Sequence, residues 1–380
     1  MSRDKRNGFL ICKNLKSRTI KISFGSFSVL LEEIMNFTFL YFKNYALLFD
    51  YDTHYRSCKT LTFITKTKIR RIDMNKKFWW LLVPSCLIIF TLIWQSFNKN
   101  SEKTLKIGIL QFVEHEALDA SRNGFIEGLK EQGFDGKIDY KNAQGDQANC
   151  TLIANQFVSE GVDLILTIAT PAAQSVAAVT SEIPILATAI TDFKETGLTQ
   201  ANLTGTSDLA PVAKQVGLIK QLKPKTRKIG ILFSSNEANS KFQAEIAIKE
   251  AEKIGLTPQI FTFSQMTEIQ QVVESMLGKV DAIYTPTDNM VASNMELISK
   301  TALQGNIPVI CGEVNLISKG AAGTFGMDYY KLGKLTAKQA IEILEGKSKP
   351  ENMPIQYLEN VKFALNQEII KKLNLKEMSP

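Results

Sequence analysis

The sequence predicts an α/β protein with two Rossmann-like lobes, each a doubly wound parallel sheet, joined by a hinge. Two observations predict this fold class: an internal repeat within residues 104–380, and short apolar strands that alternate with amphipathic helices. At 380 residues the chain is long enough for two domains of ordinary size. Its composition, with 44% hydrophobic and 22% charged residues, is typical of a globular protein.

The repeat begins with the same pentapeptide, KIGIL, at residues 106–110 and again at residues 228–232. In each half there follow an amphipathic helix, a strand that opens with Val-Asp, a Thr-Pro helix start and a strand that opens with Ile-Pro. Both halves then reach a short Gly-Thr turn that carries an aspartate, Asp208 in the first half and Asp328 in the second. This order predicts one βα unit present twice, with the chain crossing between the lobes near the two aspartates.

Strands such as KIGIL and residues 163–169 (DLILTIA) are nearly continuous in apolar residues. That pattern is typical of parallel strands that helices cover on both faces. Helical spacing is found over residues 118–129, with Gly133 as the C-terminal cap, and over residues 148–161 and 244–255.

These patterns divide the chain into five segments: an unassigned N-terminal extension (1–73), a signal or anchor segment with its linker (74–103), lobe 1 (104–208), lobe 2 (209–327), and a hinge return with a C-terminal segment that packs across the lobes (328–380). The extension carries no recognisable motif. It is either a small cytoplasmic domain or the product of a start assigned upstream of the true one, since Met74 opens a well-formed signal pattern, MNKKFWWLL.

Residues 78–94 (FWWLLVPSCLIIFTLIW) form an uncharged run that follows Lys76 and Lys77. Such a run, with basic residues on its N-terminal side, is typical of a signal sequence or single-span anchor. We therefore expect the globular part to be extracytoplasmic and held at the cell membrane. Residues 83–86 (VPSC) loosely resemble a lipoprotein processing site, so cleavage of the anchor and lipidation at Cys86 are open alternatives.

Charge separates the two parts of the chain. The formal net charge is +7, but residues 1–103 hold 18 Lys and Arg against 7 Asp and Glu, whereas residues 104–380 hold 27 against 31. A slightly acidic globular part argues against a nucleic-acid partner, because phosphate binding needs a concentrated basic face. Five cysteines without CxxC spacing and two histidines argue against a metal site, and no cofactor is expected. A disulfide between Cys150 and Cys311 is an open alternative to two free thiols.

Two Thr-Pro pairs, Thr170-Pro171 and Thr285-Pro286, directly follow strands at the edge where open parallel sheets bind their ligands. In each pair we expect the threonine to be the N-cap and the proline to occupy the first helical turn. A helix that begins this way offers free N–H groups and a partial positive charge, which are sufficient to hold a carboxylate without arginine.

Acids that follow other strands suit a ligand ammonium, Asp192 and Asp288 above all. Aromatic residues at the same level, Phe112, Phe193 and Phe233, are candidates to line an apolar side-chain pocket, but ordinary core packing is the favoured interpretation of each. The expected ligand-binding residues are Phe112, Glu116, Thr170, Pro171, Ala172, Thr191, Asp192, Asn236, Glu237, Thr287, Asp288, Asn289 and Glu313.

His115 beside Glu116 and Asp119 has the composition of a general base with an orienting carboxylate. The sequence nevertheless contains no Gly-x-Ser-x-Gly elbow, no Gly-x-Gly-x-x-Gly turn and no Walker loop. We therefore expect a binding protein and not an enzyme.

Seven blocks, taken in order, resemble one known family. They are IGILQFVEHEALDASRNGF, TIATPAAQSVA, NLTGTSD, ILFSSNEANS, YTPTDNMVAS, CGEVNLISKGAAGTFGMDYYKLG and AIEILEGKSKPENMPI. Together they resemble the ABC transporter substrate-binding proteins of the tryptophan and tyrosine importer type, which have the type I periplasmic-binding-protein fold. The likeness covers about residues 104 to 375.

The resemblance implies a receptor that closes around a small ligand and delivers it to an ABC permease and its ATPase. It implies an aromatic amino acid, such as tryptophan, phenylalanine or tyrosine, as the leading ligand. Two alternatives use the same fold: the ligand-sensing domain of a membrane sensor or regulator, and a receptor for a sugar or another small solute.

Overall fold

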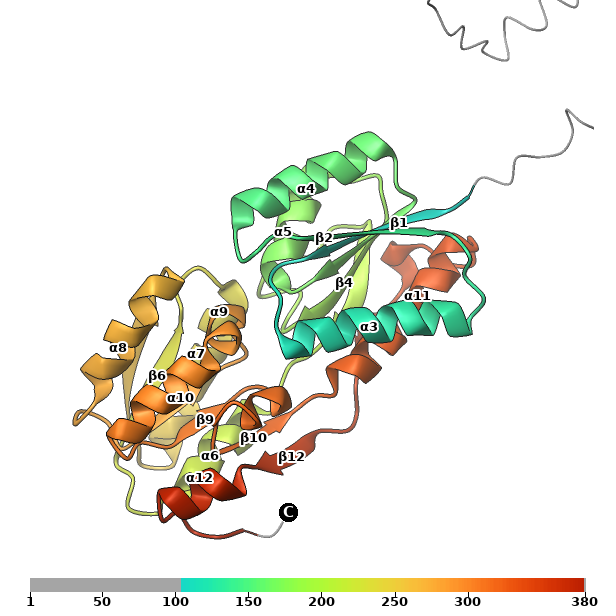
Figure 1. The fold of residues 1–380 in the computed structure, drawn as a ribbon. Coiled ribbons are helices and arrows are strands. Elements are labelled where there is room, and N and C mark those ends of the chain that lie inside the picture. Colours follow the sequence, from blue (N-terminus) through green and yellow to red (C-terminus); the bar gives the residue numbers. More distant parts are fainter. Residues whose placement is uncertain (1–103, 379–380) are drawn as a thin grey trace, which may run out of the picture. The chain divides into compact units, whose positions relative to one another are not determined.

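The computed structural model describes residues 104–378, which form two sheets of six strands each, one in each lobe (Figure 1). The strand order is β11-β5-β4-β3-β1-β2 in lobe 1 and β12-β10-β9-β8-β6-β7 in lobe 2. All paired strands run parallel except β10 and β12, which are antiparallel. The expected fold class is confirmed.

Lobe 1 is built from β1 (Lys106–Gln111), α3 (Glu116–Glu131), β2 (Lys137–Asn142), α4 (Gln147–Glu160), β3 (Leu164–Ile168), α5 (Thr170–Val179), β4 (Ile185–Ile190), β5 (Leu203–Ser207), α11 (Tyr329–Leu344), the 3₁₀ turn η3 (Pro350–Asn352) and β11 (Gln356–Tyr357). Lobe 2 is built from α6 (Val212–Leu222), β6 (Lys228–Ser234), α7 (Ala238–Lys253), β7 (Thr257–Phe263), η1 (Met266–Glu268), α8 (Ile269–Met276), β8 (Ala282–Thr285), α9 (Asn289–Ser293), α10 (Met295–Gln304), β9 (Val309–Cys311), η2 (Val314–Ile317), β10 (Gly323–Gly326), β12 (Lys362–Leu365) and α12 (Gln367–Lys372).

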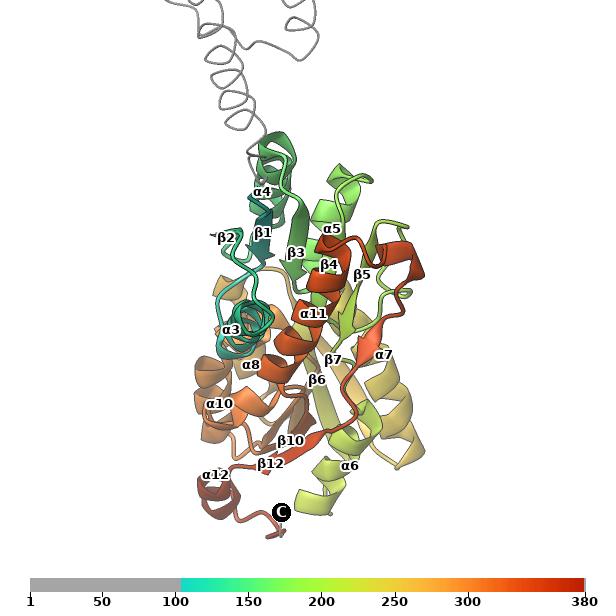
Figure 2. The same ribbon diagram turned by 90° about the vertical axis from the view of Figure 1, so that its right-hand side faces the viewer.

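Helices cover both faces of each sheet. In lobe 1, α3 and α11 pack together on one face, and α4 and α5 lie on the other (Figures 1 and 2). In lobe 2, α6 and α7 pack together, and α8 and α10 form the second pair. Strands β3, β4 and β8 are therefore buried along their whole length, which explains their continuous apolar sequences.

The two halves repeat each other in space as they do in sequence. The KIGIL pentapeptides form β1 and β6, which occupy the same position in the two strand orders. The prediction of a Gly-Thr turn in each half was wrong. Gly205 lies inside β5 and Gly323 is the first residue of β10, and both residues pair with a neighbouring strand. Gly205 has φ +156°, and a Cβ there would lie 1.8 Å from the carbonyl oxygen of Ala187. The close approach of β4 thus requires a glycine.

Within the described residues the chain crosses between the sheets three times, at residues 208–211, 327–328 and 358–361. The third crossing exists because β11 joins the sheet of lobe 1 while β12 joins that of lobe 2. Helix α11 thus returns to lobe 1, where it packs along α3 (Figure 1).

Helix α4 ends at Gly161 in the left-handed conformation, as the pattern predicts. Helix α7 begins at Ala238, six residues before the expected start. Cys150 and Cys311 are both free and buried in different lobes, so the alternative of a disulfide between them is excluded. In the described part of the chain no helix is long and apolar enough to cross a bilayer. The run at 78–94 and Cys86 lie outside the described residues.

Candidate functional site

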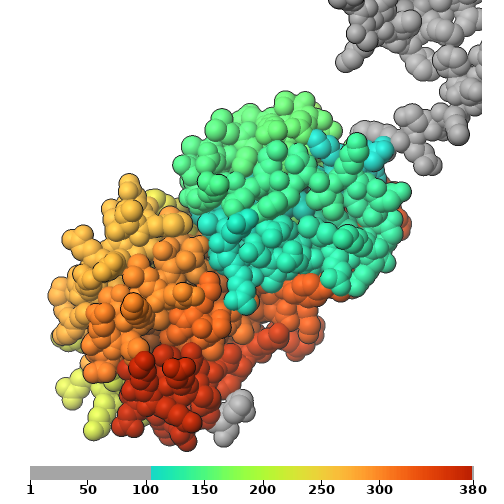
Figure 3. Space-filling model, viewed as in Figure 1, coloured from blue at the N-terminus to red at the C-terminus, as the bar shows by residue number. Residues whose placement is uncertain are grey.

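The two lobes meet along a contact that is visible from outside (Figure 3), and buried polar side chains from both lobes lie there. They follow the carboxyl ends of the parallel strands, the position at which open α/β sheets bind ligands. The lobe 1 members of this cluster are His115 after β1, Thr170 at the start of α5, Thr191 after β4 and Asp208 after β5. The lobe 2 members are Glu237, Asn239 and Gln243 at the start of α7, Thr285 and Thr287 around the end of β8, Asp288 and Asn289 at the start of α9, and Glu313 after β9.

Two hydrogen bonds in this cluster join the lobes directly. The Nε2 atom of His115 lies 3.2 Å from Oδ1 of Asn289, and Nε2 of Gln243 donates to Oγ1 of Thr191 at 3.1 Å. Both bonds connect residues of different lobes, so both must break if the lobes separate.

On the lobe 2 side, two carboxylates are held by backbone amides. Glu237 accepts hydrogen bonds from the amides of Asn289 and Met290, at 3.1 and 3.0 Å, and from the side chain of Asn289. Asp288 accepts from the amides of Ser234 and Val291 at 2.7 and 2.8 Å. Burial, with the charge of Asp288 nearby, raises the pKa of Glu237 to about 8, and burial also raises the pKa of Asp288.

A second network lies at the first crossing between the lobes. Asp208 is 2% exposed and accepts from the hydroxyls of Thr191, at 3.2 Å, and Tyr329, at 2.7 Å. Burial raises the pKa of Asp208. Tyr329 begins α11, directly after the second crossing. The hydrogen bond from its hydroxyl to Asp208 therefore connects the first crossing to the second.

Several buried polar atoms of the cluster have no hydrogen-bond partner among the described residues. They are Nδ1 of His115, Oγ1 of Thr170, Oδ1 of Asn239, Oγ1 of Thr285, Oγ1 of Thr287 and Oε2 of Glu313. Leaving a buried polar group unsatisfied costs about 1–3 kcal/mol. Both lobes contribute such atoms, so a polar ligand between the lobes would satisfy donors and acceptors on its two sides.

The two Thr-Pro pairs differ from the expectation and from each other. Ala169, with φ +83°, is the N-cap of α5, and Thr170 is its first residue, so the hydroxyl of Thr170 is left without a partner. Thr285 ends β8 and does not start a helix. Helix α9 begins four residues later and is capped by Asp288, whose carboxylate is a better acceptor for the first free amides. Helix α5 remains a helix start that can hold an anion through its free amides.

The remaining predicted residues are spread more widely. Phe112 is buried directly after β1, and Pro171 and Ala172 are buried in the first turn of α5. Asp192 is half-buried and accepts from the amide of Glu195 at 2.9 Å, so it caps its own turn. Asn236 is exposed and donates to the carbonyl of Ser264 at 2.9 Å.

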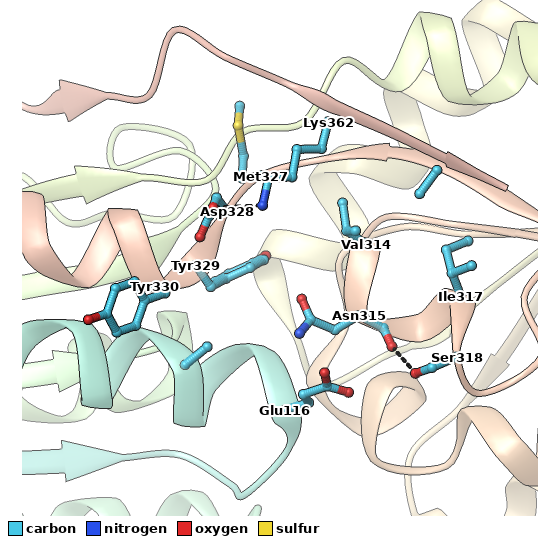
Figure 4. Close-up of a pocket in the computed structure, with 12 residues that line it drawn as sticks. Glu116, Val314, Asn315, Ile317, Ser318, Met327, Asp328, Tyr329, Tyr330 and Lys362 are labelled. Atoms are coloured by element: carbon cyan, nitrogen blue, oxygen red, sulfur yellow. Dashed lines mark hydrogen bonds and ion pairs between the residues drawn. The ribbon is translucent and has the colours of Figure 1, made fainter. Parts of the chain in front are cut away.

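Glu116, the first residue of α3, lies on a cavity of about 510 Å³ (Figure 4). The cavity is lined by the first turn of α3, by η2, by the second crossing and by β12. Tyr329 lines this cavity and donates its hydroxyl to Asp208, so it separates the cavity from the buried cluster. An ion pair between Lys362 and Asp328, at 2.7 Å, closes one side.

Sequence reasoning missed Asp208, Asn239, Gln243 and Tyr329 as members of the site. For Asp208 a signal was present, because the repeat marks it as the counterpart of Asp328. Gln243 lies within α7 and Tyr329 opens α11, and no local pattern distinguishes them from other helix residues.

Two lobes with parallel sheets, three crossings between them and a buried polar cluster at their strand ends define a two-lobed ligand-binding protein. Residues 106–378 match the family described as ABC transporter substrate binding protein, and the chain belongs to this family. The family consists of solute-binding proteins that work outside the cytoplasm together with ABC permeases.

Individual relatives are similar over the same region. A curated tyrosine-binding protein from Clostridioides difficile (strain R20291) is 39% identical over 290 residues, which is 74% of this chain and 84% of that protein. A Streptococcus pneumonia structure described as an ABC domain in complex with L-Trp is 36% identical, with a TM-score of 0.70, and covers 72% of this chain and 96% of its own.

A third relative helps to place the conformation. The ligand-free, open structure of a substrate-binding protein with adhesive properties from Clostridium difficile is 39% identical and covers 72% of this chain and 96% of its own, with a TM-score of 0.56. The structure described here is thus more similar to the L-Trp complex than to the open, ligand-free protein. The hydrogen bonds between the lobes agree with that similarity.

Proposed function

We propose that this receptor binds an aromatic amino acid between its lobes and delivers it to an ABC permease. The observation that carries the proposal is the buried polar cluster, in which both lobes present unpartnered donors and acceptors. The relatives that bind tyrosine and L-Trp support an aromatic side chain on the ligand.

The chemistry of the cluster fits a zwitterion. Helix α5 offers free amides and the hydroxyl of Thr170 to a carboxylate. Lobe 2 offers carboxylates to an ammonium, with no arginine or lysine in the cluster to compete for them. We assign ligand contacts to the predicted residues that the fold brings together at the interface: Thr170, Thr191, Glu237, Thr287, Asn289 and Glu313.

Thermal-shift screening of the purified chain against the twenty amino acids and common sugars tests this proposal. A ligand present at a hundred times its dissociation constant adds about 2.7 kcal/mol to the free energy of unfolding, which raises the melting temperature measurably. Tryptophan, tyrosine or phenylalanine is expected to give the largest shift. A sugar as the best ligand would refute the amino-acid assignment and leave the family membership intact.

We also propose that residues 78–94 hold the receptor at the membrane, with residues 104–378 outside the cytoplasm. The support is the basic-flanked apolar run and the extracytoplasmic location of the family. The protein is expected to sediment with membranes and to be cleaved by protease added to intact cells. Protection of the globular part in intact cells would refute this topology.

A further inference from the structure

We propose that Glu313 is the residue that holds the ammonium group of the ligand. The inference rests on the proposed function, since it names the recognition element of that same site. It differs from the sequence-based expectation, which favoured Asp192 and Asp288 for this role.

Glu313 is placed in the interior by the strand that precedes it. It follows β9 by two residues, at the N-cap position of η2, and is 1% exposed. Its Oε2 atom has no hydrogen-bond partner among the described residues. The Nδ1 atom of His115 lies 3.9 Å from this oxygen, which is beyond hydrogen-bonding distance. His115 does not supply a positive charge that could pair with Glu313, because burial lowers the pKa of the imidazole to about 4 and keeps it neutral.

The other buried acids of the cluster are occupied. Glu237 and Asp288 each accept two backbone amides, and Asp208 accepts the hydroxyls of Thr191 and Tyr329. Each of these carboxylates therefore has a structural role without a ligand. Glu313 differs from them because one of its buried oxygens is unpartnered.

The charges around Glu313 favour an added cation. The groups that act on it are Asp208 at the first crossing, Asp288 at the start of α9, Glu237 at the start of α7, Lys319 after η2 and the neutral His115. Burial first, and then the three carboxylates, raise the pKa of Glu313 well above its ordinary value, and Lys319 opposes them. An ammonium that binds beside Glu313 would favour the ionised carboxylate and donate a charge-assisted N–H···O⁻ hydrogen bond to Oε2.

The test is titration calorimetry at pH 7.5 on the full chain, purified in mild detergent. The probes are L-tryptophan and 3-(indol-3-yl)propionic acid, which lacks only the amino group, or L-tyrosine or L-phenylalanine with its own deaminated acid if that amino acid gives the larger thermal shift. Wild-type protein is expected to bind the amino acid at least tenfold more tightly than the deaminated acid.

Glu313→Gln should weaken binding of the amino acid by ten- to a hundredfold and leave the affinity for the deaminated acid nearly unchanged. Its melting temperature should not fall, because the oxygen that is lost has no partner in the fold. Asp192→Asn is the matched control and should bind like wild type.

Glu313→Gln with amino-acid affinity within twofold of wild type would overturn the inference while the receptor function stands. Should the variant fail to fold, the wild-type arm still decides, since equal affinity for the two probes would also overturn it. A protein that binds no amino acid in the screen would refute the proposed function, and this inference with it.

Discussion

Asp192 lies two residues after β4 and Asp288 three residues after β8, and the carboxylates of both accept hydrogen bonds from backbone amides. Asp192 accepts the amide of Glu195 within its own turn. Asp288 caps α9 through Val291 and also accepts the amide of Ser234 on β6, so it joins two elements. A carboxylate that satisfies two buried amides stabilises the fold whether or not a ligand is present.

Asp288→Asn is therefore expected to destabilise the protein. The amide that replaces one oxygen is a donor, and it would face the N–H of either Ser234 or Val291. An unsatisfied buried amide costs about 1–3 kcal/mol in the free energy of unfolding, which urea denaturation would measure. Asp192→Asn, at a half-buried turn, should change that free energy by less than about 0.5 kcal/mol. Equal losses in the two variants would contradict the difference in their roles.

Buried ionisable groups also predict a pH dependence of stability. Folding raises the pKa of Glu237 from its ordinary value of 4.5 to about 8, so between these values the folded state binds more protons and stability falls as pH rises. Folding lowers the pKa of His115 from 6.5 to about 4, so between these values the unfolded state binds more protons and stability rises with pH. Above pH 6.5 His115 adds no further change. The free energy of unfolding should fall between pH 6.5 and 8. In Glu237→Gln that fall should be smaller, and an unchanged slope would exclude Glu237 as its source.

At the scale of elements, the packing of α3 against α11 joins the first part of lobe 1 to the segment that returns from lobe 2. The two helices approach closely at two glycines. A Cβ at Gly333 would lie 1.9 Å from the carbonyl oxygen of Ser121, and a Cβ at Gly124 would lie 2.0 Å from that of Tyr330. Contact with backbone atoms cannot be relieved by a rotamer change, so a side chain at either position forces the helices apart.

Gly333→Ala should therefore lower the melting temperature by several degrees, because overpacking costs about 1–3 kcal/mol in the free energy of unfolding. Gly217→Ala, in the interior of α6 with open space around it, is the control. There alanine is expected to stabilise the helix by about 0.5–1 kcal/mol. Differential scanning calorimetry of the two variants would show shifts of opposite sign, and shifts of the same sign would refute the packing argument.

At the scale of the whole described region, the lobes are held together by few specific bonds. The bonds from Gln243 to Thr191 and from His115 to Asn289 join residues of different lobes, whereas the rest of the cluster bonds within one lobe or to a crossing. Ligand contacts from both lobes would add to these bonds and shift the population toward the closed form. Part of the protein is thus expected to be closed even without ligand. The strength of these two hydrogen bonds determines how large that closed fraction is.

Gln243→Met removes the hydrogen bond to Thr191 and keeps a side chain of similar length. The ligand-free variant should be more open than wild type, with a larger radius of gyration in small-angle X-ray scattering. A saturating aromatic amino acid should reduce the radius of gyration of both proteins. Gln270→Met, on the exposed surface of α8, is the control and should scatter like wild type. No effect of ligand on either protein would argue against hinge closure.

The sequence by itself determined the two-lobed architecture, because its information is local and periodic. Repeated strands such as KIGIL, helices of regular apolar spacing and right-handed connections leave few arrangements other than two parallel sheets. The same reasoning predicted a ligand-binding edge, and the fold brings Thr170, Glu237 and Glu313 into the buried cluster between the lobes. Their contact with a ligand stays a prediction.

Only the tertiary structure decided which of these side chains are free to bind. Asp288 was assigned to the ligand from sequence because nothing local showed that the amide of Ser234, 54 residues earlier, would bond to it. Gln243 and Tyr329 gave no signal, since each acts on a partner in the other lobe or at another crossing. Hydrogen bonding is a competition among groups brought together by folding, and which acceptor remains unpartnered depends on neighbours that are distant in the chain.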